Sequence, residues 1–296
     1  MKVGYNGTVL GAGEAVISVH DHGFLYGLGL FETMRTYGGE PFLLERHYAR
    51  LMEGCRELGI EWRMELDELR TWIRACMAAN DLDEAYVRLT VSAGEGELGL
   101  QTAPYEQPNA IVLVKPLPSM DEQLYVAGRE LRLLETRRNT PETRVRMKSL
   151  HYMNNVVAKR ELAMSGAAAG AEGLMRTREG WLAEGIVSNV FFVKDGIIRT
   201  PSLGTGILPG ITRAVVLELA HSLGMLTEEG LYTWDDLLAA DEAWLTNSVQ
   251  ELVPVTRLVS GIGGDAGTTV LSELSGGVIG HTTAALLAAY RAMTGQ

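Results

Sequence analysis

The chain has 296 residues, 46% of them hydrophobic, and a formal net charge of −11. This length and apolar content allow a large core and two domains, whereas the acidic balance, without a basic patch, argues against a nucleic acid partner. No uninterrupted apolar run approaches membrane-spanning length, and the start MKVGYNG has no basic segment leading into one. We therefore expect a soluble cytoplasmic protein that meets anionic ligands with a few placed arginines.

The first elements in chain order predict a small α/β domain. Residues 2–10 form a predicted hairpin that turns at Asn6-Gly7, a dipeptide that favours two-residue turns. A linker is indicated by the run Pro116-Leu117-Pro118, so the predicted domains are 1–117, a small N-terminal α/β domain, and 118–296, a larger C-terminal domain. Hydrophobic periodicity between the hairpin and the linker predicts helices at 44–58 and 66–79 and strands at 85–93 and 109–115.

Several polar side chains of this half allow two interpretations. His20 and His22 are close enough to suggest a metal pair, but no third ligand follows, so packing and hydrogen bonding are favoured. Arg50 adjoins the apolar stripe of its helix, either as a surface arginine or as an anion ligand. Arg88 lies in an alternating strand, where it either faces solvent or meets a substrate carboxylate. The cysteines, Cys55 and Cys76, fall at apolar positions of different helices, which favours buried thiols.

The second half begins with a strand near 130–135 and a basic, irregular segment that contains Lys148. The chain has only five lysines against 21 arginines, so chemistry that needs a primary amine has few candidates. Four arginines between 137 and 146 disfavour the charged amine, which would lower the pKa of Lys148 and supply the neutral amine that a Schiff base requires. The structural alternative is a solvated lysine at the start of a helix predicted at 149–165.

The stretch 172–213 combines two features that suit a flat phosphorylated ring. Short strands with tight turns precede a Gly-rich loop, 204–210, which leads into a helix at Ile211. Backbone N–H groups at such a helix start, with the Thr212 hydroxyl, can bind phosphate, although Gly-rich loops before helices are also common structural features. Glu184, in Ala-Glu-Gly, would project a carboxylate from a strand end. The last predicted elements are a strand at 252–258 and a helix at 282–293.

Three motifs resemble the signatures of the class IV aminotransferase family. They are EG…SN.F…G.I.TP…GIL.GITR within 172–213, DHGFLYG…FET.R.Y.G…L..H..RL within 21–51, and K.L.Y..N on 148–155. The resemblance implies a two-domain α/β (α+β) protein of fold-type IV, like the D-amino-acid aminotransferases, with pyridoxal 5'-phosphate (PLP) as cofactor and no metal. It also implies a homodimer.

The resemblance assigns cofactor contacts residue by residue. Lys148 would bind PLP covalently and then move the proton, and Glu184 would keep the pyridine nitrogen protonated. Arg50, the arginine of H..RL, would hold the phosphate as a planar bidentate donor. The other implied contacts are the phosphate ligands Ile211, Thr212 and Ser248, the ring-hydroxyl partner Tyr152, and Leu208 against a ring face.

Within the family, longer stretches such as FETMRTYGGEPFLLERH and RRNTPETRVRMKSLHYMNN are similar to the 4-amino-4-deoxychorismate lyases of Gram-positive bacteria. This similarity implies conversion of a small amino-carboxylate, aminodeoxychorismate, to 4-aminobenzoate and pyruvate in folate biosynthesis. The candidates to meet its two carboxylates are Arg88, Arg35 and one of the arginines among residues 137–146. The predicted substrate contacts are Tyr26, Phe31, Thr33, Arg35 and Arg88.

Other functions stay open on the sequence alone. A branched-chain aminotransferase would keep every cofactor residue, and it has a Tyr-x-Arg comparable to Tyr86 and Arg88. The D-amino-acid aminotransferases carry an Arg-x-His that residues 94–100 lack, which weakens that alternative. A non-catalytic binding protein would not need both Lys148 and Glu184.

Overall fold

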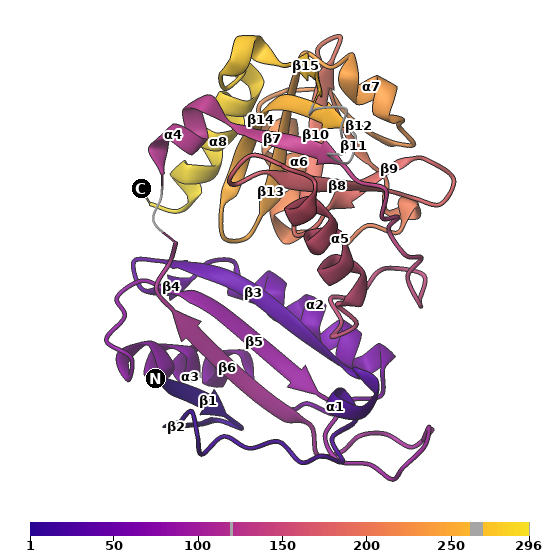
Figure 1. The fold of residues 1–296 in the computed structure, drawn as a ribbon. Coiled ribbons are helices and arrows are strands. Elements are labelled where there is room, and N and C mark those ends of the chain that lie inside the picture. The colour runs from indigo at the N-terminus through magenta and orange to yellow at the C-terminus, as the bar shows by residue number, and fades with distance from the viewer. Residues whose placement is uncertain (119–120, 261–268, 296) are drawn as a thin grey trace. The chain divides into compact units, whose positions relative to one another are not determined.

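A computed structural model describes residues 1–118, 121–260 and 269–295. The chain divides into two compact units, Met1–Ser119 with Met147–His151 and Met120–Arg146 with Tyr152–Gln296. Each unit has its own sheet, helices and core (Figure 1). The predicted two-domain α/β class is confirmed.

The first unit contains an antiparallel sheet with the order β2-β1-β6-β5-β3-β4 among the described residues. The predicted hairpin is confirmed, because Asn6 and Gly7 take the positive φ values, 45° and 82°, that its tight turn requires. The strands are β1 (Lys2–Tyr5), β2 (Thr8–Gly11), β3 (Gly29–Tyr37), β4 (Glu40–Pro41), β5 (Tyr86–Ser92) and β6 (Asn109–Lys115).

Two helices, α2 (Leu44–Glu57) and α3 (Leu66–Ala78), pack on one face of this sheet (Figure 1). Both were predicted from periodicity, and their apolar stripes meet alternate residues of β3 and β5 in one core. Cys55 and Cys76 are buried and free, as predicted, and burial raises their thiol pKa values to about 12 and about 11. A short helix, α1 (His22–Tyr26), was not predicted.

The segment Met147–His151 corrects the predicted helix at 149–165. The helix α5 begins only at Met153 and ends at Met164. Before it, the chain is extended and pairs with β3: Phe31 N–H donates to Lys148 O at 2.9 Å and Leu150 N–H donates to Gly29 O at 3.0 Å. These bonds pair backbone N–H and C=O groups that would have bonded to one another within a helix. Lys148 therefore lies beside a strand and not at a helix start.

The second unit contains a mixed sheet with the order β12-β11-β10-β13-β14-β7-β8-β9, and β15 pairs with β14. β7 runs parallel to both β14 and β8. The predicted turn at Asp195-Gly196 joins β10 to β11, with φ values of 53° and 73°. The strands are β7 (Arg129–Leu133), β8 (Glu172–Arg176), β9 (Leu182–Gly185), β10 (Asn189–Lys194), β11 (Ile197–Pro201), β12 (Thr227–Gly230), β13 (Glu242–Asn247), β14 (Glu251–Ser260) and β15 (Thr269–Glu273).

The helices of this unit include two that were predicted, α6 (Ile211–Ser222) and α8 (His281–Met293). They contact each other and pack on β13, and α8 also packs on β14 (Figure 1). Two short helices, α4 (Glu122–Ala127) and α7 (Trp234–Leu238), complete the unit. Among the described residues, no helix has the length and hydropathy needed to cross a lipid bilayer.

Candidate active site

Four of the five predicted substrate contacts lie on one face of the first unit's sheet. Phe31, Thr33 and Arg35 alternate along β3 with residues of the helix-covered core, and Arg88 lies opposite Thr33 on β5. Cζ of Arg88 is 3.7 Å from the centroid of the Phe31 ring, which is a cation–π distance. The period-two pattern of the sequence thus brings these side chains together.

The fifth predicted contact, Tyr26, ends α1, and its hydroxyl accepts a hydrogen bond from Gly99 N–H at 2.9 Å. The neighbouring His22 is buried, with Nδ1 2.7 Å from the Tyr105 hydroxyl and Nε2 2.9 Å from Glu97 O. Both ring nitrogens therefore have protein partners. Throughout the described part of the chain, no three His, Cys, Asp or Glu side chains form a group that could hold a metal ion.

Lys148 is held against β3 by its own backbone. Its Nζ lies 4.6 Å from the centroid of the Phe31 ring, the same ring that Arg88 contacts. Gly29 permits this approach, because a Cβ there would lie 2.8 Å from Leu150 Cδ1 and 2.6 Å from Val91 O. The amine is thus fixed beside the aromatic and cationic side chains of β3 and β5.

Arg50, the predicted phosphate ligand, binds a buried carboxylate through two nitrogens of its guanidinium group. Its Nε and Nη2 donate to Glu32 Oε1 and Oε2 at 2.8 and 2.6 Å, and His47 Nδ1 donates to Oε2 at 2.6 Å. Burial raises the pKa of Glu32, but the charge of Arg50 and the hydrogen bonds from Arg50 and His47 outweigh burial and lower it to about 2. Burial also lowers the pKa of His47 and favours its neutral ring, whose Nδ1 carries the proton because a carboxylate only accepts.

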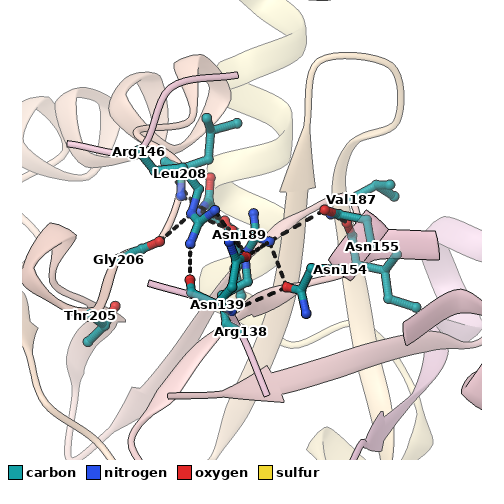
Figure 2. Close-up of polar contacts among 12 residues, drawn as sticks. Arg138, Asn139, Arg146, Asn154, Asn155, Val187, Asn189, Thr205, Gly206 and Leu208 are labelled. Carbon is teal, nitrogen blue, oxygen red and sulfur yellow. Dashed lines mark hydrogen bonds and ion pairs between the residues drawn. The ribbon is translucent and has the colours of Figure 1, made fainter. Parts of the chain in front are cut away.

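Glu184, the predicted partner of the ring nitrogen, is buried on β9 in the second unit. Its Oε1 accepts a hydrogen bond from Arg138 Nε at 2.7 Å. Its Oε2 accepts from Leu208 N–H at 2.9 Å and from Asn189 Nδ2 at 3.3 Å. Figure 2 shows Arg138, Asn189 and Leu208, the three residues that donate these bonds. The carboxylate is therefore held by one cation, one backbone group and one amide.

The start of α6 offers an anion-binding arrangement in the same unit. Gly210 is the N-cap and provides no side-chain cap, so the first N–H groups of the helix have no acceptor within it. A Cβ at Gly210 would lie 2.0 Å from Asn189 Oδ1, so only glycine fits there. The hydroxyl oxygens of Thr212 and Ser248 lie 3.5 Å apart, although Ser248 is far along the chain. The structure thus brings three predicted phosphate ligands together: Ile211, Thr212 and Ser248.

Residues 29–258 match the family model described as amino-transferase class IV. The chain belongs to the class IV aminotransferase family. It is 43% identical to the aminodeoxychorismate lyase of Bacillus subtilis (strain 168), over 86% of this chain and 85% of that one. It resembles the solved 4-amino-4-deoxychorismate lyase of Pseudomonas aeruginosa (TM-score 0.82, 31% identity, 98% of each chain). It also resembles the branched-chain aminotransferase of Thermoproteus uzoniensis solved with norvaline (TM-score 0.83, 27% identity, 99% of this chain and 94% of that one).

These similarities confirm the predicted fold-type IV architecture and the predicted family. Each unit by itself has groups that suit PLP. The second unit has a helix start with two hydroxyls for a phosphate and a buried carboxylate for a ring nitrogen, and the first unit has the amine of Lys148. Tyr152 occupies the N-cap position of α5, directly after the lysine segment. Leu208 presents a half-buried side chain while its backbone binds Glu184.

The structure adds three residues that bind predicted site residues. Arg138, expected only as one of several possible carboxylate ligands, binds Glu184, and Glu32, which was not predicted, binds Arg50 together with His47, also not predicted. Glu32 belongs to the FET motif, and His47 belongs to the H..RL motif together with Arg50. Their place in these motifs could have been used to predict that they lie near Arg50. Arg138 is one of several arginines in an irregular segment, and its sequence context does not distinguish it from Arg137.

Proposed function

We propose that this protein is a PLP-dependent 4-amino-4-deoxychorismate lyase that forms 4-aminobenzoate and pyruvate for folate biosynthesis. The observation that carries the proposal is the identity with the Bacillus subtilis lyase over most of the chain. The local geometry supports it, because Lys148, Arg88 and Phe31 lie together in a unit whose sheet face also carries Arg35.

In this proposal the cofactor is held at three points. Arg50, with the start of α6, Thr212 and Ser248, would bind the phosphate; Glu184 would bind the ring nitrogen; and Lys148 would form the covalent link. When bound, PLP would supply an electron sink for charge that develops on the substrate. Tyr152 would donate to the ring hydroxyl and Leu208 would pack against the ring.

The protein's own groups then have few tasks. Lys148 is the base that removes the C4 proton of the substrate, and it is held in place by the Phe31–Lys148 backbone bond. Loss of that proton and of pyruvate makes the remaining ring aromatic, so the reaction needs no second substrate. The Glu184 carboxylate, which accepts hydrogen bonds from Arg138 and Leu208 N–H, would face the ring nitrogen.

The substrate carries two carboxylates, and two arginines of one sheet face suit them. Arg88 and Arg35 lie on neighbouring strands, on the face that bears Phe31 and Thr33. A guanidinium binds a carboxylate through two parallel hydrogen bonds, which fixes its orientation as well as its charge. Phe31 and Tyr26 would contact the substrate ring.

The decisive experiment supplies enzymatically made aminodeoxychorismate to the purified holoenzyme and measures both products. We expect 4-aminobenzoate and pyruvate in equal amounts. Rapid amino transfer from glutamate to a branched-chain 2-oxo acid, without lyase activity, would instead support the branched-chain aminotransferase that the Thermoproteus uzoniensis neighbour suggests. Transfer from D-alanine would support a D-amino-acid aminotransferase.

We also propose that the protein is a cytoplasmic homodimer that acts on a small molecule and binds neither nucleic acid nor membranes. Large apolar side chains on α1 and in the segment between β5 and β6 support an interface: Phe24 is 73% exposed, Leu98 76% and Leu100 92%. Light scattering should give twice the mass of the 32.2 kDa chain. Substituting Phe24 and Leu100 with serine should shift the mass toward that of one chain.

A further inference from the structure

Arg138 is a buried arginine with two sets of partners. Its side chain is 7% exposed, and its Nε donates to Glu184 Oε1 at 2.7 Å. Its Nη1 faces three amide oxygens, those of Asn154 at 2.8 Å, Asn139 at 3.0 Å and Asn155 at 3.4 Å (Figure 2). One guanidinium therefore connects the carboxylate of β9 to the first turn of α5.

The asparagines are themselves fixed, so the direction of the guanidinium is fixed too. Asn154 Nδ2 donates to Arg137 O at 2.9 Å, and Asn155 Nδ2 donates to Ile186 O at 2.5 Å. These bonds orient each amide with its oxygen toward Arg138. The backbone N–H of Arg138 donates to Arg176 O on β8 at 2.9 Å, which ties the residue to the sheet.

The carboxylate of Glu184 is left with room for a further donor. An ionised carboxylate has about four acceptor positions, and the bonds from Arg138, Leu208 and Asn189 take three of them. Arg146 lies farther off, with Nε 3.9 Å from Oε1, and donates instead to Gly206 O and to Asn139. Burial, followed by the charge of Arg138, lowers the pKa of Arg146 to about 10.

We propose that Arg138 is a positioning residue: together with Asn154 and Asn155 it holds the Glu184 carboxylate so that its remaining acceptor position faces the nitrogen of the cofactor ring. The inference rests on the proposed use of PLP, and it does not depend on which substrate is converted. It also gives a role to the asparagine of the K.L.Y..N motif, which touches no predicted ligand.

The proposal requires an arginine. The guanidinium can donate to Glu184 from Nε and to the asparagines from Nη1 at the same time, because its donors diverge in a rigid plane. A lysine at 138 would keep the charge but offer one compact donor group. A carboxylate oxygen held toward the ring nitrogen accepts a hydrogen bond, which favours a proton on that nitrogen.

The test compares Arg138→Gln with Arg199→Gln, a matched change in the same unit. Arg199 also donates through Nε to a glutamate, Glu228 at 3.3 Å, but both side chains are more exposed. We expect the affinity of the apo-protein for PLP to fall about tenfold in Arg138→Gln and to stay at the wild-type value in Arg199→Gln. The Arg138→Lys variant should be intermediate.

A spectroscopic readout separates positioning from a general structural effect. A pH titration of the visible band of the lysine-bound cofactor reports the charge on the ring, because a protonated ring nitrogen lowers the pKa of the linked imine nitrogen. In Arg138→Gln the midpoint should move upward by about half a pH unit or more, in the same direction as in Glu184→Gln. Thermal unfolding of each apo-protein checks that the variants are folded.

A double-mutant cycle tests whether Arg138 acts through Glu184. If it does, adding Arg138→Gln to Glu184→Gln changes PLP affinity by less than about twofold. The inference would be overturned if Arg138→Gln lowered PLP affinity equally in the wild-type protein and in Glu184→Gln. It would also be overturned if the titration midpoint of Arg138→Gln matched that of Arg199→Gln. Failure of the wild-type protein to bind PLP would instead overturn the proposed function. If Arg138→Gln does not fold, Arg138→Lys and Asn154→Ala provide the same comparison.

Discussion

Glu32 and Glu184 are buried carboxylates in different units, and each binds an arginine, but the two arginines bind differently. Arg50 donates to both oxygens of Glu32, and His47 adds a third bond. Arg138 donates through Nε to a single oxygen of Glu184 and through Nη1 to asparagines. A fork that contacts both oxygens stabilises the pair itself, whereas a single contact leaves the carboxylate able to bind a ligand. The geometry of each pair, and not its charge, decides whether its carboxylate can bind a further ligand.

The largest expected effect lies outside both pairs. Lys148→Ala should lower lyase activity by on the order of 10³-fold or more, because it removes both the covalent link and the base. Borohydride treatment of the wild-type holoenzyme, followed by peptide mass spectrometry, should place the reduced cofactor on Lys148. Lys159→Ala, at an exposed position of α5, is the control and should keep activity and label. A label on any other lysine would contradict the assignment.

Features that depend on residues close together in the chain could be predicted from the sequence, and features that depend on distant residues could not. The Asn6-Gly7 hairpin, the helices α2 and α3 and the alternation of β5 depend on neighbouring residues, and all are found in the structure. The extended conformation of Lys148 was missed because its partners are on β3, more than 100 residues earlier in the chain. Periodicity describes one segment at a time, so a strand contact of this kind leaves no pattern in it.

The same reasoning applies to the site. The motifs predict roles for Lys148, Glu184 and Arg50 because each is part of a long signature. The bond from Arg138 to Glu184 was not predicted, because it depends on contacts with β9 and α5. The neighbouring arginines have a similar sequence context, so the sequence does not single out Arg138. Which arginine meets a carboxylate is decided by tertiary packing, which a single sequence does not encode locally.

Exchanging each carboxylate for an amide would test the comparison directly. Glu32→Gln should lower the free energy of unfolding of the apo-protein by about 3 kcal/mol, because it breaks a buried, three-bond charge cluster. Glu184→Gln should lower stability less, since only one of its three bonds comes from a charged donor, but should lower kcat more. Urea unfolding and steady-state kinetics on both variants measure the two effects. A larger stability loss in Glu184→Gln would contradict the distinction.

Acid should weaken the first unit through the same cluster. The pKa of Glu32 falls from its ordinary 4.5 to about 2 on folding. Its stabilising contribution is therefore complete above about pH 4.5 and is lost as pH falls toward 2, a change of about 3 kcal/mol. Burial lowers the pKa of His47, so its contribution is lost as pH falls below its ordinary 6.5. Urea unfolding from pH 7 to pH 3 should show a decline that is shallower in Glu32→Gln. If the free energy of unfolding fell equally with pH in the wild-type protein and in Glu32→Gln, Glu32 would not be the cause of the decline.

The smallest expected effect is on substrate binding. Here Arg88 should bind a substrate carboxylate, and not a buried carboxylate of the protein. Arg88 contacts the Phe31 ring at 3.7 Å, which orients the guanidinium without using all its hydrogen-bond donors. Arg88→Gln should raise KM about tenfold through loss of a charged hydrogen bond to a carboxylate, with kcat changed less and PLP affinity unchanged. Arg63→Gln, with a side chain 83% exposed, is the control. An unchanged KM in Arg88→Gln would mean that the substrate carboxylates are bound elsewhere, and Arg35→Gln would then be the variant to measure.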